Sequence, residues 1–370
     1  MNKFKSGLIL LLATLILVAC GGNNDVPGKP RFTAMVSFGD SLSDVGSYNV
    51  GLVAGIGGGQ FTINAASSVK ATTPTNWTEF TSLSLGLGMP CAAETGLDNN
   101  TAPPGTPLGT SIPVTQYPLC NGYAQGGSRV TDPTGVGNKN VPVVPPTPVG
   151  FALTVPVITQ IQNFLTRHGS FSANDIVFVM AGANDVFIQA STAGAIITAN
   201  PASAAVATAS GVAAVQTAAT ELANDVKTQI IGNGAKYVVV MNVPDIASTP
   251  AATPSTAGLL GLLVTSFNTQ LKANLPDSIN VLNVDAYTAS KDEVANPAKY
   301  NLTNVTGTAC NLTYPTNLLG SSLACNAGNL NAGVLPTDHY LFADTVHPTP
   351  YGHLLFATYV LQAMTNKGWY

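Results

Sequence analysis

A serine that follows a buried strand and a turn is the first residue of this chain that could carry chemistry. The apolar run 32–38 is typical of a buried strand, and Gly39-Asp40 after it is a turn signal. Ser41 would therefore lie just beyond the carboxyl end of a strand, where open α/β sheets bind ligands. A hydroxyl there is a candidate nucleophile if a base and an oxyanion site occur elsewhere. Alone, Gly-Asp-Ser is also common in ordinary turns.

A candidate base and its partner lie together near the C-terminus. They belong to the segment Phe342-Ala343-Asp344-Thr345-Val346-His347-Pro348. One local turn can bring the Asp344 carboxylate to an imidazole nitrogen of His347, where it would hold the tautomer and stabilise the imidazolium formed by the Ser41 proton. A surface turn is the plain alternative. Among the four histidines the competing pair is Asp338-His339, whose adjacent side chains would tend to point apart.

Two further segments offer donors for a developing oxyanion. The apolar run 175–180 predicts a buried strand, and Gly182-Ala183-Asn184-Asp185 follows it. The Asn184 amide could donate to an oxyanion, although Asn184 or Asp185 could instead cap a helix. In the second segment, Asn121 to Ser128, the adjacent glycines Gly126 and Gly127 would let a backbone N–H approach a ligand closely.

In combination these segments resemble the conserved blocks of the GDSL lipase/esterase family, also called SGNH hydrolases. The four matching segments, in family order, are Gly39-Asp40-Ser41-Leu42-Ser43-Asp44, Tyr123-Ala124-Gln125-Gly126-Gly127, Gly182-Ala183-Asn184-Asp185 and Asp344-Thr345-Val346-His347-Pro348. The resemblance spans residues 36–348. It implies Ser41 as nucleophile, His347 as base and Asp344 as the group that orients the base. It also implies an oxyanion hole formed by the Ser41 and Gly127 N–H groups and the Asn184 side chain.

Two positions depart from the family pattern. The family often has Asn directly before Tyr-Ala in the second block, whereas Gly122 stands here and Asn121 lies one residue earlier. The choice between Gly126 and Gly127 as oxyanion donor therefore stays open, with Gly127 favoured. Ser47 stands where the family often has Asn, which would alter the loop behind the nucleophile without removing a catalytic group.

The rest of the chain supplies elements that can position these residues. Strands are predicted at 175–180, 236–241 and 279–284, and helices at 155–168, 202–231, 256–275 and 350–366. Strands that alternate with helices imply parallel pairing with helices on both faces. The resemblance implies the same α/β class, a three-layer α/β/α sheet of about five parallel strands. A single domain at 31–370 is expected.

Residues 47–150 are rich in Gly, Thr, Pro and Asn, and we interpret them as a loop-rich insertion that shapes the substrate cleft. A short helix is predicted within it at 76–83. Four cysteines remain when Cys20 is set aside, and an even number suggests disulfides in an oxidising compartment. Of three connectivities, proximity favours Cys91–Cys120 with Cys310–Cys325. A metal site is the alternative, which no Cys-x-x-Cys or paired-histidine spacing supports.

The N-terminus is typical of a bacterial lipoprotein. A basic start and an apolar run, too short for the ~20 residues of a bilayer-spanning helix, predict a signal peptide at 1–19. Its end resembles a lipobox, which implies acyl chains on Cys20 and attachment to a membrane. Because Gly21 follows, the sorting rule of Gram-negative lipoproteins favours the outer membrane, with the domain facing the periplasm or the outside. Residues 20–30 would form a tether. An uncleaved anchor or a soluble secreted protein are the alternatives.

Composition excludes several classes of function. The net charge is −4, charged residues make up 9% of the chain, and no basic patch suggests nucleic acid. A mean hydropathy of +0.26 does not fit a disordered protein. No phosphate-binding or dinucleotide motif occurs between a strand and a helix, so no cofactor is expected.

The sequence therefore predicts a serine esterase or lipase that hydrolyses carboxylic esters through an acyl-enzyme on Ser41. A carbohydrate O-acetylesterase of the same family is the alternative within this class. A non-catalytic surface binding lipoprotein is the alternative from another class, and it would need one member of the triad to be missing or blocked.

Overall fold

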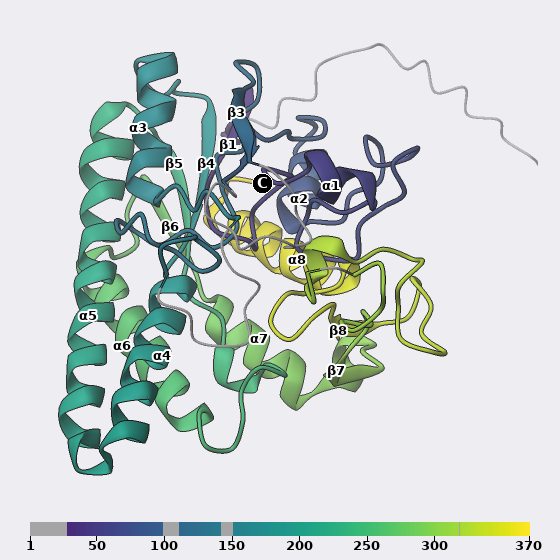
Figure 1. The fold of residues 1–370 in the computed structure, drawn as a ribbon. Coiled ribbons are helices and arrows are strands. Elements are labelled where there is room, and N and C mark those ends of the chain that lie inside the picture. The colour runs from purple at the N-terminus through teal and green to yellow at the C-terminus, as the bar shows by residue number, and fades with distance from the viewer. Residues whose placement is uncertain (1–27, 99–110, 142–150, 318) are drawn as a thin grey trace, which may run out of the picture.

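The structure, a computed structural model, describes residues 28–98, 111–141, 151–317 and 319–370 (Figure 1). The predicted signal peptide at 1–19, Cys20 and most of the tether lie outside these ranges. The described chain is built on a parallel sheet in the order β1-β4-β5-β6. These strands are Ala34–Gly39, Asp175–Met180, Tyr237–Met241 and Val281–Val284. Their residues are mostly apolar and buried, as expected of strands covered on both faces.

A fifth segment, residues 121–125, lies along the free edge of β1. The Ser37 N–H donates to the Asn121 carbonyl at 3.1 Å, and the Tyr123 N–H donates to the Ser37 carbonyl at 2.8 Å. The Gln125 N–H continues the pairing to the Gly39 carbonyl at 3.1 Å. The sheet thus has four regular strands instead of about five, because the fifth position forms only an isolated parallel bridge before the chain turns.

Alternate residues of the strands face two different helical layers. One face, which includes Val36, Phe38 and Val177, packs in the same core as α3 (Val157–His168), α4 (Ala183–Ala199), α5 (Ala204–Asp225) and α6 (Ala257–Asn274). The other face, which includes Met35 and Phe178, packs with α2 (Trp77–Ser84) and α8 (Pro350–Lys367). Figure 1 shows the two layers on opposite sides of the sheet. The predicted three-layer α/β/α architecture is confirmed.

The alanine-rich segment is helical, as predicted. It starts with a 3-10 turn at Pro201–Ser203, runs through α5, and ends in a π-helical turn at Val226–Ile230 and a 3-10 turn at Ile231–Asn233. By length and hydropathy alone the run Pro201–Asn233 could cross a membrane, the one such helix among the described residues. Its buried residues pack in the core with those of α4 and α6, so in this fold it is a helix of the outer layer.

Several elements are not predicted by the sequence patterns. These are α1 (Gly51–Gly55), α4, α7 (Ala286–Ala295), the antiparallel pair of β2 (Glu94–Leu97) and β3 (Ile112–Gln116), the parallel pair of β7 (Asn304–Thr308) and β8 (Tyr340–Phe342), and 3-10 turns at Ile246–Ser248, Pro297–Tyr300 and Ser322–Ala324. They are short or lack a continuous apolar stripe. Four of them, α4, α7, β8 and the 3-10 turn Ile246–Ser248, nevertheless contribute residues to the site described below.

The two disulfides join Cys91 to Cys120 and Cys310 to Cys325, the pairing that proximity favours. The first one holds the insertion against the sheet edge, since the Gly122 N–H also donates to the Cys91 carbonyl at 3.1 Å. The second one lies in the loop between β7 and β8, a region in which the chain has little regular structure.

Candidate active site

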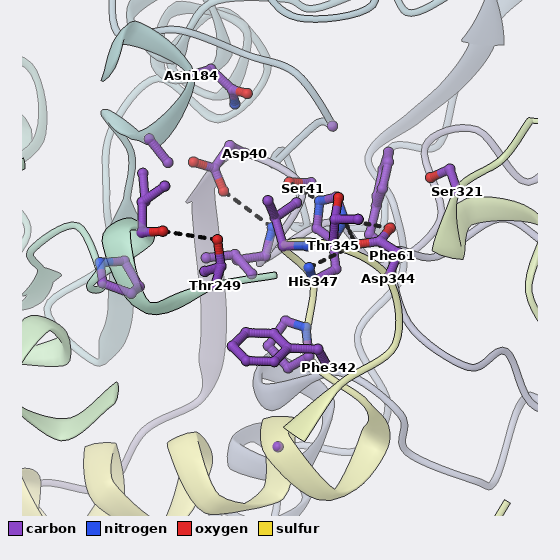
Figure 2. Close-up of a pocket in the computed structure, with 18 of the residues that line it drawn as sticks. Asp40, Ser41, Phe61, Asn184, Thr249, Ser321, Phe342, Asp344, Thr345 and His347 are labelled. Atoms are coloured by element: carbon purple, nitrogen blue, oxygen red, sulfur yellow. Dashed lines mark hydrogen bonds and ion pairs between the residues drawn. The ribbon is translucent and has the colours of Figure 1, made fainter. Parts of the chain in front are cut away.

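The structure brings Ser41, His347 and Asp344 together at the carboxyl end of β1 (Figure 2). His347 Nε2 lies 2.9 Å from Ser41 Oγ, and His347 Nδ1 lies 2.8 and 2.9 Å from the two Asp344 oxygens. With a proton on Nδ1, the imidazole donates to the carboxylate and accepts from the serine hydroxyl. The competing histidine, His339, stacks instead on Tyr351 with ring centroids 3.8 Å apart and does not line this site.

Asp344 is held by its own loop and by a neighbouring turn. One oxygen accepts the Val346 and His347 N–H groups at 2.9 and 2.8 Å, and the other accepts the Ser322 N–H at 2.8 Å. Burial by itself would raise the pKa of Asp344, but His347 and the accepted hydrogen bonds outweigh it and hold the pKa well below its usual range. The carboxylate therefore stays ionised beside the imidazole.

Close packing fixes the end of β1 just before Ser41. A Cβ on Gly39 would lie 2.1 Å from the Met180 carbonyl oxygen, and its φ of +150° also favours glycine, so this position admits no side chain. The Gln160 side chain pairs with both backbone polar groups of Gly39. It accepts the Gly39 N–H at 2.9 Å and donates to the Gly39 carbonyl at 2.8 Å. A polar residue on the otherwise apolar face of the predicted helix 155–168 was the signal that could have revealed this contact.

The loop that follows Ser41 is joined to the segment Tyr123-Ala124-Gln125-Gly126-Gly127 through Asp44. The Asp44 carboxylate accepts the N–H groups of Gly46 and Ser47 at 2.8 and 2.7 Å, and it also accepts the Ser47 hydroxyl. Across the loop it accepts the Gly126 N–H at 2.9 Å. Ser47, the departure from the family pattern, thus helps to hold this carboxylate. Asp44 belongs to the segment Gly39-Asp40-Ser41-Leu42-Ser43-Asp44, but its sequence position alone does not reveal this contact.

Three backbone N–H groups are candidate oxyanion donors, and they differ in whether an acceptor already engages them. The Gly126 N–H is engaged by Asp44, whereas the Ser41 and Gly127 N–H groups have no acceptor among the described residues. The geometry thus favours Gly127 over Gly126. The Asn184 amide donates one hydrogen to the Ser128 carbonyl at 2.9 Å, which fixes its orientation and leaves the second hydrogen free. Gly127 has a φ of +81°, and a Cβ there would lie 2.0 Å from the Val136 carbonyl oxygen.

These groups line a cavity of about 520 Å³ that is predominantly apolar. Its walls include Leu42, Phe61, Val136, Phe151, Met180, Phe187, Ile246, Val294, Leu312, Leu319, Leu341, Phe342, Val346 and Phe356. Phe61 packs on the imidazole of His347, with ring centroids 4.9 Å apart. Because Phe61, Val136 and Phe151 belong to or adjoin the insertion, that segment contributes to the cleft as expected. A cavity of this size and character can hold the apolar part of a small organic ligand.

Two further titratable residues of the cavity wall near the triad residues, Asp40 and His353, also have shifted pKa values. Burial raises the pKa of Asp40 to about 7, and the hydrogen bond from the Leu42 N–H at 3.1 Å only partly opposes it. His353, fully buried on α8, has its pKa lowered to about 3 by burial, so it is neutral. Neither side chain is hydrogen-bonded to the Ser41 hydroxyl, whose partner among the described residues is His347. The described residues contain no group of three His, Cys, Asp or Glu side chains that could hold a metal ion.

Comparison with known proteins gives one family. The model of GDSL-like lipases/acylhydrolases matches residues 35–360, a range that includes all four segments that the sequence analysis relates to that family. No curated protein matches the chain.

Proposed function

The chain belongs to the GDSL-like lipase/acylhydrolase family, and we propose that it hydrolyses carboxylic esters through an acyl-enzyme on Ser41. Membership of the family supports a serine hydrolase of the esterase or lipase type. The observation that carries the proposed mechanism is the 2.9 Å contact between Ser41 Oγ and His347 Nε2, with His347 held on its other side by Asp344.

In the first half of the reaction His347 accepts the Ser41 proton while Oγ attacks the ester carbonyl carbon. Asp344 keeps the imidazole in the required tautomer and stabilises the imidazolium. The carbonyl oxygen gains negative charge, which the Ser41 and Gly127 N–H groups and the Asn184 amide stabilise. His347 then returns the proton to the departing alkoxide, so the alcohol leaves and the acyl group stays on Ser41.

In the second half water takes the place of the alcohol. His347 removes a proton from that water as its oxygen attacks the acyl-enzyme, and the same donors stabilise the second tetrahedral oxyanion. Collapse of this intermediate returns the proton to Ser41 Oγ and releases the carboxylic acid. The cycle consumes one ester and one water molecule.

The cavity favours esters with an apolar arm over small acetyl esters of sugars. Its walls are mainly aromatic and aliphatic, and burying a hydrocarbon there stabilises the complex by about 25 cal/mol for each Å² of apolar surface removed from water. An acetyl group would use little of this surface. We therefore propose lipid-like acyl esters as substrates, with the carbohydrate O-acetylesterase as the alternative.

The test compares wild type with Ser41→Ala on p-nitrophenyl esters of increasing acyl length and on an acetylated sugar. Ser43→Ala is the matched control, because the Ser43 hydroxyl lies in the same loop, buried and without a hydrogen-bond partner. Wild type and Ser43→Ala should hydrolyse the longer esters, and Ser41→Ala should not. Equal rates from wild type and Ser41→Ala would refute the mechanism. Failure of an active-serine phosphonate to label wild type would favour a non-catalytic binding lipoprotein.

We also propose that acyl chains on Cys20 attach the domain to the outer membrane. The proposal rests on the order of a basic start, an apolar run and a lipobox-like end in residues 1–22. The proposal predicts that radioactive palmitate labels the wild-type chain. It also predicts that Cys20→Ala loses both the label and its association with the membrane. An unlabelled wild-type chain in the soluble fraction would contradict it.

A further inference from the structure

Besides Asp344, three carboxyl side chains line the cavity: Asp40, Asp245 and Glu293. Among the residues that the structure describes, no lysine or arginine lines it. Two of the three carboxyls have donors of their own. Asp40 accepts the Leu42 N–H, and Asp245 accepts the Ser248 hydroxyl. Glu293 differs from both, since it has no hydrogen bond and no ion pair with any described residue.

Glu293 is nonetheless almost fully enclosed. Its exposed fraction is 8%, and it lies on the buried side of α7. Ser290 and Val294 of the same helix also line the cavity, and Val294 packs in one apolar cluster with Leu341 and Phe342. This part of the wall therefore combines the Glu293 carboxyl and the Ser290 hydroxyl with apolar side chains.

A largely buried carboxyl that lines a cavity and has no donor from the described residues is free to pair with a group that enters the cavity. Burial, and to a smaller extent the nearby charge of Asp292, raises the pKa of Glu293 to about 7. Near neutral pH the group therefore exists in both protonation states. A hydroxyl can pair with either state, because it donates to a carboxylate and accepts from a carboxylic acid.

We propose that Glu293 binds a hydroxyl group carried on the apolar arm of the ester substrate. The cavity then selects hydroxylated fatty-acyl or hydroxyalkyl esters over esters of plain hydrocarbon chains. An anionic end group is disfavoured, because the wall has acidic side chains and no lysine or arginine to pair with it. This inference rests on the proposed esterase function and adds the substrate class to it.

The test uses pairs of esters that differ only in a terminal hydroxyl. One series has the hydroxyl on the acyl arm, as p-nitrophenyl alkanoates and their ω-hydroxy derivatives from butanoate to dodecanoate. The other has it on the alcohol arm, as alkyl acetates and ω-hydroxyalkyl acetates of matching lengths. The measured quantity is the ratio of kcat/KM for the hydroxylated ester to that for its plain partner, as a function of chain length.

For wild type we expect this ratio to peak at about tenfold or more at one chain length in one of the two series, the effect of a single hydrogen bond to a charged group. Glu293→Leu should abolish the peak and raise kcat/KM for the plain ester of that length. Glu293→Gln, which keeps the shape and a hydrogen-bonding amide, should retain part of the peak. The matched control is Asp292→Asn, which changes the neighbouring half-buried carboxyl outside the cavity lining and should leave the peak in place.

A ratio that is flat with chain length in both series of wild type would overturn the inference. A peak that persists unchanged in both Glu293 variants would also overturn it. A different result would refute the proposed esterase function: wild type would hydrolyse every ester as slowly as Ser41→Ala does. Two variants of Glu293 keep the test informative if one of them does not fold.

Discussion

The Asp44 carboxylate accepts a hydrogen bond from the Gly126 N–H at 2.9 Å, and this contact couples the loop of the nucleophile to the loop of the oxyanion donors. Because Gly127 follows directly, the contact also positions the next N–H. Asp44→Ala should lower kcat by about 100-fold, the usual cost of a misplacement of about 1 Å in a catalytic site. Kinetics of a folded variant would check this. Asp338→Ala, which changes a carboxyl outside the cavity, serves as the control, and equal kcat for wild type and Asp44→Ala would contradict the coupling.

Asn184→Ala should lower kcat by about 10² to 10³, since it removes one oxyanion donor. KM should change little, because the contact strengthens only as charge develops on the carbonyl oxygen. The same substitution loses the hydrogen bond to the Ser128 carbonyl, so a loss of stability of about 1 kcal/mol is expected. Steady-state kinetics and thermal unfolding separate the two effects. An Asn184→Ala enzyme with wild-type kcat would exclude Asn184 from the oxyanion hole.

Asp344→Asn should lower kcat by about 10⁴ because the amide no longer imposes the tautomer that leaves His347 Nε2 free to accept a proton. The variant should still bind substrate, since Asp344 holds the imidazole and not the ester. Labelling of Ser41 by a phosphonate should slow in parallel with kcat. Undiminished labelling in Asp344→Asn would show that another group orients His347.

Glu293→Gln should stabilise the protein at alkaline pH. The folded state raises the pKa of Glu293 from 4.5 to about 7, so it binds the proton more tightly than the unfolded chain does. The stabilising contribution is complete below about pH 4.5 and is lost as the pH rises through 7. At about pH 8 the free energy of unfolding of Glu293→Gln should exceed that of wild type by about 3 kcal/mol.

Denaturant unfolding at several pH values would measure this difference, which should shrink towards pH 4. A difference that does not depend on pH would mean that the ionisation of Glu293 is not its source.

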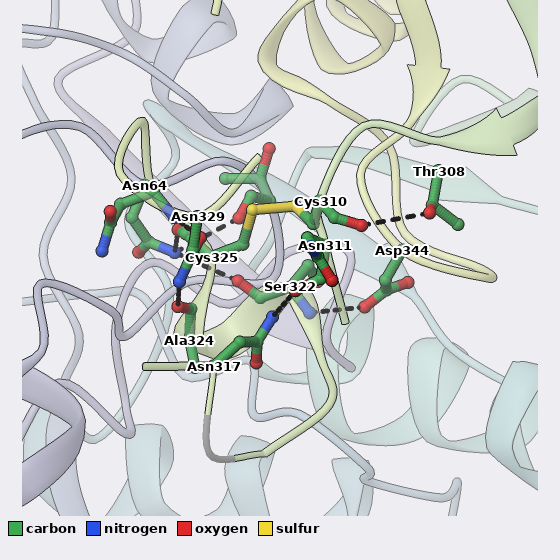
Figure 3. Close-up of a disulfide and its surroundings, with 12 residues drawn as sticks. Asn64, Thr308, Cys310, Asn311, Asn317, Ser322, Ala324, Cys325, Asn329 and Asp344 are labelled. Atoms are coloured by element: carbon green, nitrogen blue, oxygen red, sulfur yellow. Dashed lines mark hydrogen bonds between the residues drawn. A yellow bond between two sulfur atoms is a disulfide. The ribbon is translucent and has the colours of Figure 1, made fainter. Parts of the chain in front are cut away.

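Removing the Cys310–Cys325 disulfide should affect catalysis as well as stability. Figure 3 shows that this loop also contains Ser322, whose N–H donates to Asp344 at 2.8 Å. Replacing both cysteines by serine should lower the free energy of unfolding by about 3 kcal/mol, the value for a closed loop of about 15 residues. It should also reduce kcat, because the support of Asp344 is loosened.

The matched control replaces Cys91 and Cys120, whose disulfide does not adjoin Asp344. That variant should lose stability with a smaller change in kcat. A larger kcat loss from the control would contradict a special link between the Cys310–Cys325 loop and the triad.

The sequence predicts those features that depend on local pattern. Apolar runs and helical spacing reveal β4, β5, α3, α5, α6 and α8, and these are present within a few residues of their expected bounds. Four short segments in family order pointed to Ser41, Asn184, Asp344 and His347, which the structure brings to one cavity. Their catalytic roles stay predictions until the variants above are measured.

Features that depend on tertiary contact were not predictable. Helix α7 was missed because its sequence, AYTASKDEVA, lacks a continuous apolar stripe. The contacts of Asp44 with Gly126 and of Gln160 with Gly39 join residues 82 and 121 positions apart, and no local pattern encodes such a pairing. The sequence around Glu293 suggests a surface position, because the charged residues Lys291 and Asp292 directly precede it. Only the packing of α7 against its neighbours reveals that it is buried.

The nucleophile and its base lie 306 residues apart in the chain. A ribosome makes Ser41 early and His347 close to the end of synthesis, and domains assemble from the N-terminus onwards. A nascent chain thus has no working proton acceptor until nearly all of it has been made. Copies that stop early or lose the segment around His347 to proteolysis should be inert towards the cell's own esters. Because of this wide separation, only a nearly complete chain contains both residues.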